Sequence, residues 1–162
     1  MRRLIKQREI VNDEWRYADE DPLGRERALI LPFARWKAER EQWWLWDGRL
    51  GVRIGATDHV AELQHDFLRV GLIAIEFGGL AEGRGYSQAQ LLRTRYKFTG
   101  ELRAVGKIQR DQLFYMARCG FDTFELPEGA DLDVALTAFD DFSVAYQGAI
   151  DAAGVHVARR AV

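Results

Sequence analysis

Five short apolar runs, each followed by a turn and an amphipathic segment, give the chain its main pattern. The runs start roughly 20 to 30 residues apart, the spacing that successive βα units require. They are Ala28–Phe33, Leu50–Ile54, Leu72–Phe77, Glu101–Val105 and Thr123–Leu126. Glycines stand shortly before the last four runs, where a preceding helix would end. The pattern predicts an α/β fold in which five βα units form a parallel sheet.

Apolar stripes at helical spacing mark the segments that should cover this sheet. The second predicted helix carries Val60, Leu63, Phe67 and Val70, and the last carries Leu132, Ala135, Leu136, Phe139 and Tyr146. The first predicted helix is less regular, because Trp36 and Trp43 align while Trp44, Leu45 and Trp46 spread around it. Two interpretations of this apolar patch stay open, a surface for a partner and packing against the N-terminal segment.

Apolar and polar residues also alternate over residues 4–11, before the first βα unit. This alternation around Gln7 and Arg8 predicts a short N-terminal β-hairpin or an edge strand. We expect a single α/β domain over residues 1–162. It would comprise the hairpin and a connector (1–27), the five βα units (28–147) and a weakly patterned C-terminal tail (148–162).

The composition narrows the class of protein. The 162 residues are 48% hydrophobic, and 23 Lys and Arg face 25 Asp and Glu. A nucleic-acid partner is not expected, because the chain lacks the surplus of basic residues that neutralises phosphates. No apolar run approaches the roughly 18 residues that span a bilayer, and residues 1–6 lack the apolar region of a signal peptide. We therefore expect a cytoplasmic protein with no membrane contact.

Cys119 is the only cysteine, which excludes an internal disulfide and a cysteine-rich metal or cluster site. The residue stands directly before Gly120, where the preceding helix should end. A helix C-terminus disfavours a thiolate, so we expect Cys119 to be unreactive.

Four of the five runs contain one charged residue, although parallel strands covered on both faces are nearly all apolar. The charges are Arg53, Glu76, Arg103 and Glu125, and their signs alternate. One interpretation is that they pair and neutralise each other. The other makes Arg53 and Arg103 the floor of an anion site, with Glu76 or Glu125 as a proton carrier. Both favour a curved sheet like an incomplete TIM barrel over the alternative, an open doubly wound sheet.

The loop from Glu76 to Ser87 contains four glycines and should lie at the carboxyl ends of the strands, where ligands of parallel βα folds gather. Ser87 with Gln90 has the spacing of a capping box, which places Arg84 just outside a helix N-terminus that favours an anion. The predicted ligand-binding residues are Arg84, Gly85, Tyr86, Ser87, Arg53, Arg103 and Gln112. The candidate catalytic residues are Glu76, Glu125 and Asp111.

Other charged residues near this edge have weaker signals. Lys107 and Arg110 follow the fourth run and add two cations, whereas Arg93 and Arg95 lie within a predicted helix and are interpreted as solvated. Glu62 and His65 have the Glu-x-x-His spacing of di-iron bundles, but a second copy is missing, so no metal is expected. The sequence contains no standard cofactor or nucleophile motif, and the identity of a cofactor therefore stays open.

A series of motifs in the second half of the chain is similar to the bacterial domain of unknown function 934 family. The motifs are Arg84-Gly85-Tyr86-Ser87, Leu91-Leu92-Arg93, Gly100-Glu101-Leu102-Arg103-Ala104-Val105-Gly106, Asp111-Gln112-Leu113, Arg118-Cys119-Gly120-Phe121-Asp122 and the segment from Phe139 to Gln147. The resemblance covers nearly the whole chain. Two positions depart from the family pattern, since Lys107 and Glu82 stand where an aspartate is usual.

That family is commonly labelled a probable oxidoreductase involved in sulfite reduction. The resemblance implies an accessory protein of assimilatory sulfite reduction that binds a small oxyanion or a protein of the sulfite reductase pathway. The alternative is an oxidoreductase of sulfite reduction with a cofactor that the sequence does not reveal. A homodimer is also left open.

Overall fold

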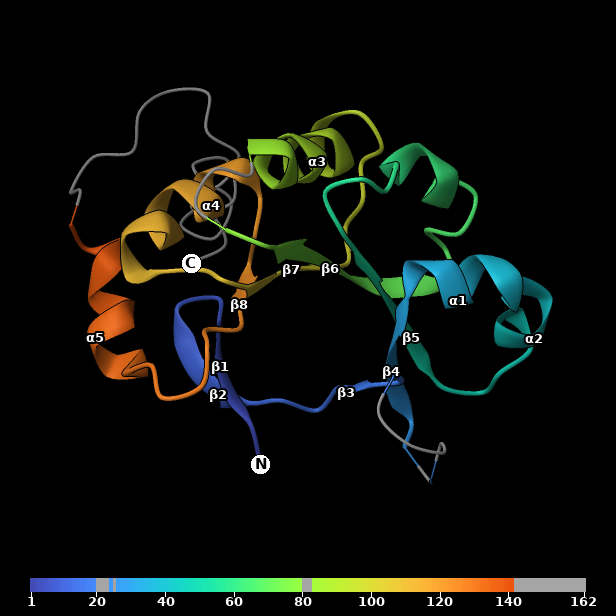
Figure 1. Ribbon diagram of the computed structural model, residues 1–162, viewed down its shortest axis with the longest axis horizontal. Helices are drawn as coiled ribbons and strands as arrows, with labels where there is room; N and C mark the ends of the chain where they lie inside the picture. Colours follow the sequence, from blue (N-terminus) through green and yellow to red (C-terminus); the bar gives the residue numbers. More distant parts are fainter. Residues whose placement is uncertain (20–23, 25, 80–82, 142–162) are drawn as a thin grey trace, which may run out of the picture.

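A curled eight-stranded sheet organises this computed structural model, which describes residues 1–19, 24, 26–79 and 83–141 (Figure 1). The strand order across the sheet is β2-β1-β8-β7-β6-β5-β4-β3. The strands are β1 (Arg3–Lys6), β2 (Glu9–Asn12), β3 (Arg16–Tyr17), β4 (Ala28–Pro32), β5 (Arg49–Ile54), β6 (Val70–Phe77), β7 (Glu101–Gly106) and β8 (Thr123–Phe124). The sheet has the shape of a half-barrel, so the expected curvature is confirmed.

All five predicted runs form strands, β4 to β8, and each pairs in parallel with the next. The expectation of a wholly parallel sheet is wrong, because the N-terminal hairpin joins it. Strand β1 pairs antiparallel with both β2 and β8. Gln7 and Arg8 form the tight turn of this hairpin with φ values of 50° and 66°, which match the twist of the flanking strands. Strand β3 extends the opposite edge beside β4.

Helical segments connect the strands. The α-helices are α1 (Phe33–Ala38), α2 (Arg40–Trp44), α3 (Gly83–Thr94), α4 (Leu113–Cys119) and α5 (Leu132–Leu136), and the 3₁₀ helices are η1 (Val60–Leu63), η2 (Arg110–Gln112) and η3 (Thr137–Phe139). Five regular βα units are not present, because only η1 and turns connect β5 to β6. Buried Asp66 in these turns accepts hydrogen bonds from Trp36 and Trp44, and such tertiary contacts outweigh the local helical periodicity.

The two faces of the sheet differ in their covering. The α-helices lie on the outer side of the curl (Figure 1), and alternate strand residues such as Ile73, Ala104 and Phe124 form the main core there. The inner face holds a smaller apolar cluster that includes Ile30 and Ala74. The chain between β2 and β3 crosses the open side of the curl (Figure 1), so residues from the N-terminal segment face the inner side of the sheet.

Some expectations concern residues that the structure does not describe. The C-terminal tail (148–162), Tyr146 of the last helical stripe and Glu82 lie outside the described residues. Within the described chain, no helix combines the length and apolar character needed to cross a bilayer.

Candidate functional site

The four charges predicted within the strands share the inner face of the sheet. In the register of the parallel strands, Arg53 pairs with Ala74, Ala74 with Arg103, and Arg103 with Thr123. Glu76 and Glu125 each lie two residues after a member of this row, and side chains two residues apart in a strand share a face. The predicted row on one face of a curved sheet is therefore confirmed.

Arg103 lies at the centre of this face with only 1% of its side chain exposed. Its Nη1 atom donates to Asp13 Oδ2 and its Nη2 atom donates to Asp13 Oδ1, each at 3.0 Å. Nη2 also donates to Glu101 at 2.9 Å, and Nη1 lies 3.5 Å from Glu125. Burial alone would lower the pKa of Arg103, but the bonds and charges of Asp13 and Glu101 raise it above its usual value. The guanidinium group is fully engaged and permanently charged.

Glu125 links this buried network to the surface. Its Oε2 atom accepts a hydrogen bond of 2.7 Å from the Tyr17 hydroxyl, and its Oε1 atom lies 2.8 Å from Arg2 Nη1. Burial raises the pKa of Tyr17 above its usual range, and the negative charge of Glu125 raises it further. Tyr17 therefore stays a hydrogen-bond donor that fixes the orientation of the carboxylate.

Asp13 is the most buried member of the network that sequence analysis missed. Its carboxylate, 2% exposed, bonds Arg103, and its Oδ2 atom lies 2.6 Å from Arg2 Nη2. Burial alone would raise the pKa of Asp13, but the hydrogen bonds and charge of Arg103, with the Trp15 amide and Arg2, hold it below its usual range. Asp13 lies in a polar connector and 90 residues from Arg103, so no local signal pointed to it.

Arg53 and Glu76 form a second pair near the carboxyl ends of β5 and β6. Arg53 Nη2 lies 2.7 Å from Asp19 Oδ2, and Arg53 Nε lies 3.6 Å from Glu76 Oε2. Its guanidinium group also stacks over the Tyr17 ring at 5.3 Å. Each predicted cation of the row thus has a carboxylate partner. This geometry supports the interpretation that the row is a structural network, and direct ligand binding by Arg53 and Arg103 stays a prediction.

The capping box predicted at Ser87 is wrong, because α3 begins four residues earlier, at Gly83. Ser87 instead lies within the helix, where its Oγ atom contacts the Gly83 carbonyl oxygen at 3.5 Å. Arg84 consequently belongs to the first turn of α3 and is exposed. The small Gly83 can start the helix, and the serine then bonds back to the preceding turn.

Gly85 has a packing role in the structure. A Cβ atom at this position would lie 2.6 Å from Cε1 and Cζ of Phe77, so only glycine lets α3 lie this close to β6. The neighbouring Tyr86 packs edge-to-face against the Phe77 ring, and its hydroxyl accepts a hydrogen bond of 3.1 Å from Gln112 Nε2. The structure therefore brings two predicted ligand residues, Tyr86 and Gln112, into direct contact.

The remaining charged residues near the strand ends differ in their contacts. Arg110 bonds Thr137 and lies 3.0 Å from Asp141, whereas Lys107 and Asp111 are exposed and have no ion pair among the described residues. The expectation that Arg93 is solvated is wrong. Its guanidinium group donates to three backbone carbonyls and lies 3.0 Å from Asp122, so it ties the end of α3 to the start of β7 and β8.

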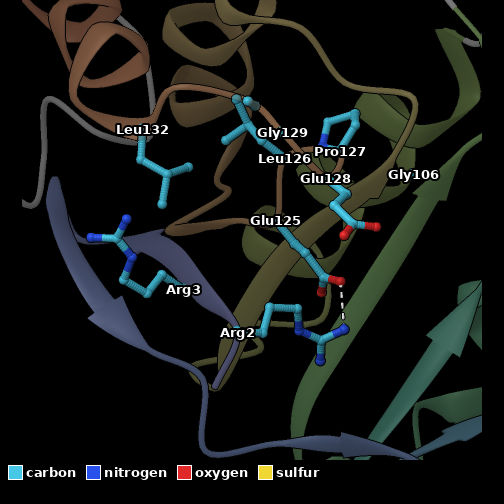
Figure 2. A pocket seen from close by; sticks show the side chains of 10 residues that line it. Arg2, Arg3, Gly106, Glu125, Leu126, Pro127, Glu128, Gly129 and Leu132 are labelled. Atoms are coloured by element: carbon cyan, nitrogen blue, oxygen red, sulfur yellow. Dashed lines mark hydrogen bonds and ion pairs between the residues drawn. The ribbon is translucent and has the colours of Figure 1, made fainter.

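Two cavities lie beside the buried network. The larger, about 640 Å³, lies beside the carboxyl ends of β7 and β8, and Figure 2 shows its lining side chains. Arg2, Arg3, Glu125 and Glu128 supply its charges, while Leu126, Pro127 and Leu132 supply apolar surface. The smaller, about 200 Å³, is lined by Lys6, Asp13, Glu101 and Arg103 with neighbouring residues. The buried network lies between the two openings.

The described residues contain no group of three or more His, Cys, Asp or Glu placed to hold a metal ion. Glu62 is instead paired with Lys37 at 3.1 Å, and His65 contacts the neighbouring Gln64. Cys119 is buried at the end of α4, before Gly120 with a φ of 116°, as its sequence position predicted.

The tryptophans of the first helical region divide into two groups. Trp36 and Trp43 are buried, which accounts for much of the expected patch by packing. Trp44 is 42% exposed, and its neighbour Leu45 is 88% exposed. Leu68, in the turns before β6, is 99% exposed.

Together, the fold and this site define an α/β protein with a curled mixed sheet whose inner face carries a buried arginine–carboxylate network. The chain belongs to the family described as "Bacterial protein of unknown function (DUF934)", which matches residues 51–156. Comparison with curated proteins and with solved structures gives no match.

Proposed function

We propose that this protein is a cytoplasmic accessory protein of assimilatory sulfite reduction that binds a small oxyanion at the carboxyl ends of β6 and β7. The metabolic role rests on the sulfite-reduction label of the family that the chain resembles. The oxyanion rests on the distribution of paired and unpaired cations in the structure.

The observation that carries the binding site is a pair of exposed cations, Arg84 and Lys107, with no ion pair among the described residues. Both lie near Phe77 at the end of β6, because the Lys107 amide donates to the Phe77 carbonyl oxygen and Gly85, next to Arg84, packs against the Phe77 ring. Arg84 occupies the first turn of the 12-residue helix α3, where backbone N–H groups and the helix dipole also favour an anion.

The arginines of the inner face are less suitable for an oxyanion. Arg103 already bonds three carboxylates, and Arg53 has Asp19 and Glu76 as partners. An incoming anion would have to displace these carboxylates and leave them uncompensated, which costs several kcal/mol in a buried setting. Cations without such partners bind an anion with no equivalent cost.

Binding to a reductase of the pathway is the second part of the proposal. Leu45 and Leu68 are almost fully exposed, and Trp44, directly before Leu45 in the chain, is partly exposed. Trp44 and Leu45 adjoin, and adjoining exposed apolar side chains that include a tryptophan are typical of protein contacts. Such a contact would give the accessory protein a physical link to the reductase.

Growth on defined sulfur sources tests the proposed role. In the organism that encodes the protein, deletion of the gene should slow growth on sulfate or sulfite but not on sulfide or cysteine, which lie beyond the reduction step. The wild-type gene should restore growth, whereas a gene for the Arg84→Gln, Lys107→Gln double variant should not. Arg95→Gln is the matched control, because Arg95 is exposed at the opposite end of α3.

Equal growth of the deletion strain on all four sulfur sources would contradict the role in sulfite reduction. Normal rescue by the double variant would contradict the site. A flavin or haem absorption band in the purified protein would favour the alternative, an oxidoreductase with a bound redox cofactor.

A further inference from the structure

The cavity beside β8 combines charges of both signs that have no partner in the described protein. Arg3 lines it from β1, and Glu128 lines it from the loop after β8. Neither residue forms an ion pair within the described chain. Figure 2 shows Arg3 on the β1 side of the cavity and Glu128 on the opposite side. A cation and an anion thus line opposite sides of the same cavity.

Glu125 adds a second, preorganised carboxylate to the same cavity. A carboxylate offers about four acceptor positions, and Arg2, Tyr17 and Arg103 occupy three of those of Glu125. The side chain is 16% exposed, so one acceptor position remains for a donor that enters the cavity. Because the Tyr17 hydroxyl stays protonated, it holds this carboxylate in one orientation.

Apolar side chains supply another part of the cavity wall. Leu126, Pro127 and Leu132 line the cavity, and its volume of about 640 Å³ lies within the usual range for small-molecule sites. A ligand that fits this lining carries an anionic end, a cationic end several bonds away and an apolar group between or beside them.

We propose that the cavity binds a short zwitterionic peptide, with its carboxylate on Arg3, its ammonium on Glu128 and Glu125, and an apolar side chain against Leu126 and Leu132. A peptide matches the separated charges of the cavity, whereas in a single amino acid the ammonium and carboxylate groups are attached to the same carbon. This site is independent of the oxyanion site, since it uses neither Arg84 nor Lys107.

Calorimetric titration with alanyl-leucine and its derivatives tests the peptide site. N-acetyl-alanyl-leucine lacks the ammonium and alanyl-leucinamide lacks the carboxylate, so each should bind about tenfold more weakly than alanyl-leucine. Arg3→Gln should weaken alanyl-leucine about tenfold and leave the amide derivative unchanged. Glu128→Gln should weaken alanyl-leucine and leave the acetylated derivative unchanged. Arg95→Gln is the matched control and should bind alanyl-leucine like the wild type, because Arg95 is exposed and belongs to neither proposed site.

Several results would overturn the peptide site. They are no heat of binding from alanyl-leucine up to its solubility limit, equal binding to both variants and the wild type, and free leucine binding as tightly as the dipeptide. A loss of sulfite binding in Arg84→Gln with normal dipeptide binding would leave this inference intact. The failure of one proposal is therefore distinguishable from the failure of the other.

Discussion

The inner face of the sheet shows how buried charges can be tolerated when their numbers balance. Around Arg103 the network contains three cations and three carboxylates: Arg2, Lys6 and Arg103 with Asp13, Glu101 and Glu125. Each carboxylate accepts from at least two of these cations. A balanced network avoids the cost of an isolated buried charge, whereas removal of one member leaves an uncompensated partner.

Asp13→Asn tests this balance through its pH dependence. At neutral pH the variant should lose about 3 kcal/mol of unfolding free energy, because Arg103 and Arg2 lose a shared anion. The folded-state pKa of Asp13 lies below the usual value of 3.8, so its stabilisation is present above that pH. It is lost as the pH falls through the folded-state pKa.

The measurement is urea unfolding of the wild type and Asp13→Asn from neutral pH down to below the folded-state pKa of Asp13. The difference in unfolding free energy should be constant above pH 3.8 and should shrink below it. Asp111→Asn is the control, because this exposed carboxylate has no described ion pair. A difference that stays constant into acid would contradict the account of Asp13.

The elements were predictable where their local pattern was strong. The apolar runs predicted all five strands β4 to β8, and the alternation around Gln7 predicted the hairpin. The helix expected between β5 and β6 was wrong, because the bonds of Asp66 to distant side chains replace it with turns. The start of α3 was misplaced because Ser87 matched a capping pattern that tertiary packing of Gly85 overrides.

Two glycines of α3 provide a matched test of this packing. Gly85→Ala should destabilise the fold by about 1 to 2 kcal/mol, because the added Cβ meets the Phe77 ring and the overlap outweighs the gain in helix propensity. Gly83→Ala has nothing within 4 Å of its Cβ and should be neutral or stabilise by up to about 1 kcal/mol. Thermal unfolding measures both, and a stabilising Gly85→Ala would rule out the close packing of α3 on β6.

The whole molecule depends on contacts that no local pattern contains. The hairpin and β3 add three strands to the five predicted ones and change the parallel sheet into a mixed half-barrel. The charges inside the strands correctly indicated curvature and a polar inner face. Asp13 and Arg2 of the site escaped prediction because Arg103 lies 90 residues from Asp13 and Glu125 lies 123 residues from Arg2 in the chain. The sequence predicted a site at the carboxyl ends of the strands. It could not predict the cavity beside β8, because β1 forms part of the lining of that cavity.

The central claim is that the exposed cations Arg84, in the first turn of α3, and Lys107, after β7, bind an oxyanion, and the arginines of the inner face do not. Calorimetric titration of sulfite at constant ionic strength tests it most directly, with sulfate as a second oxyanion. The wild type and Arg95→Gln should bind sulfite with the same affinity, and the Arg84→Gln, Lys107→Gln double variant should bind it at least about tenfold more weakly. Equal affinity of all three proteins for sulfite, or no binding by the wild type, would contradict the account.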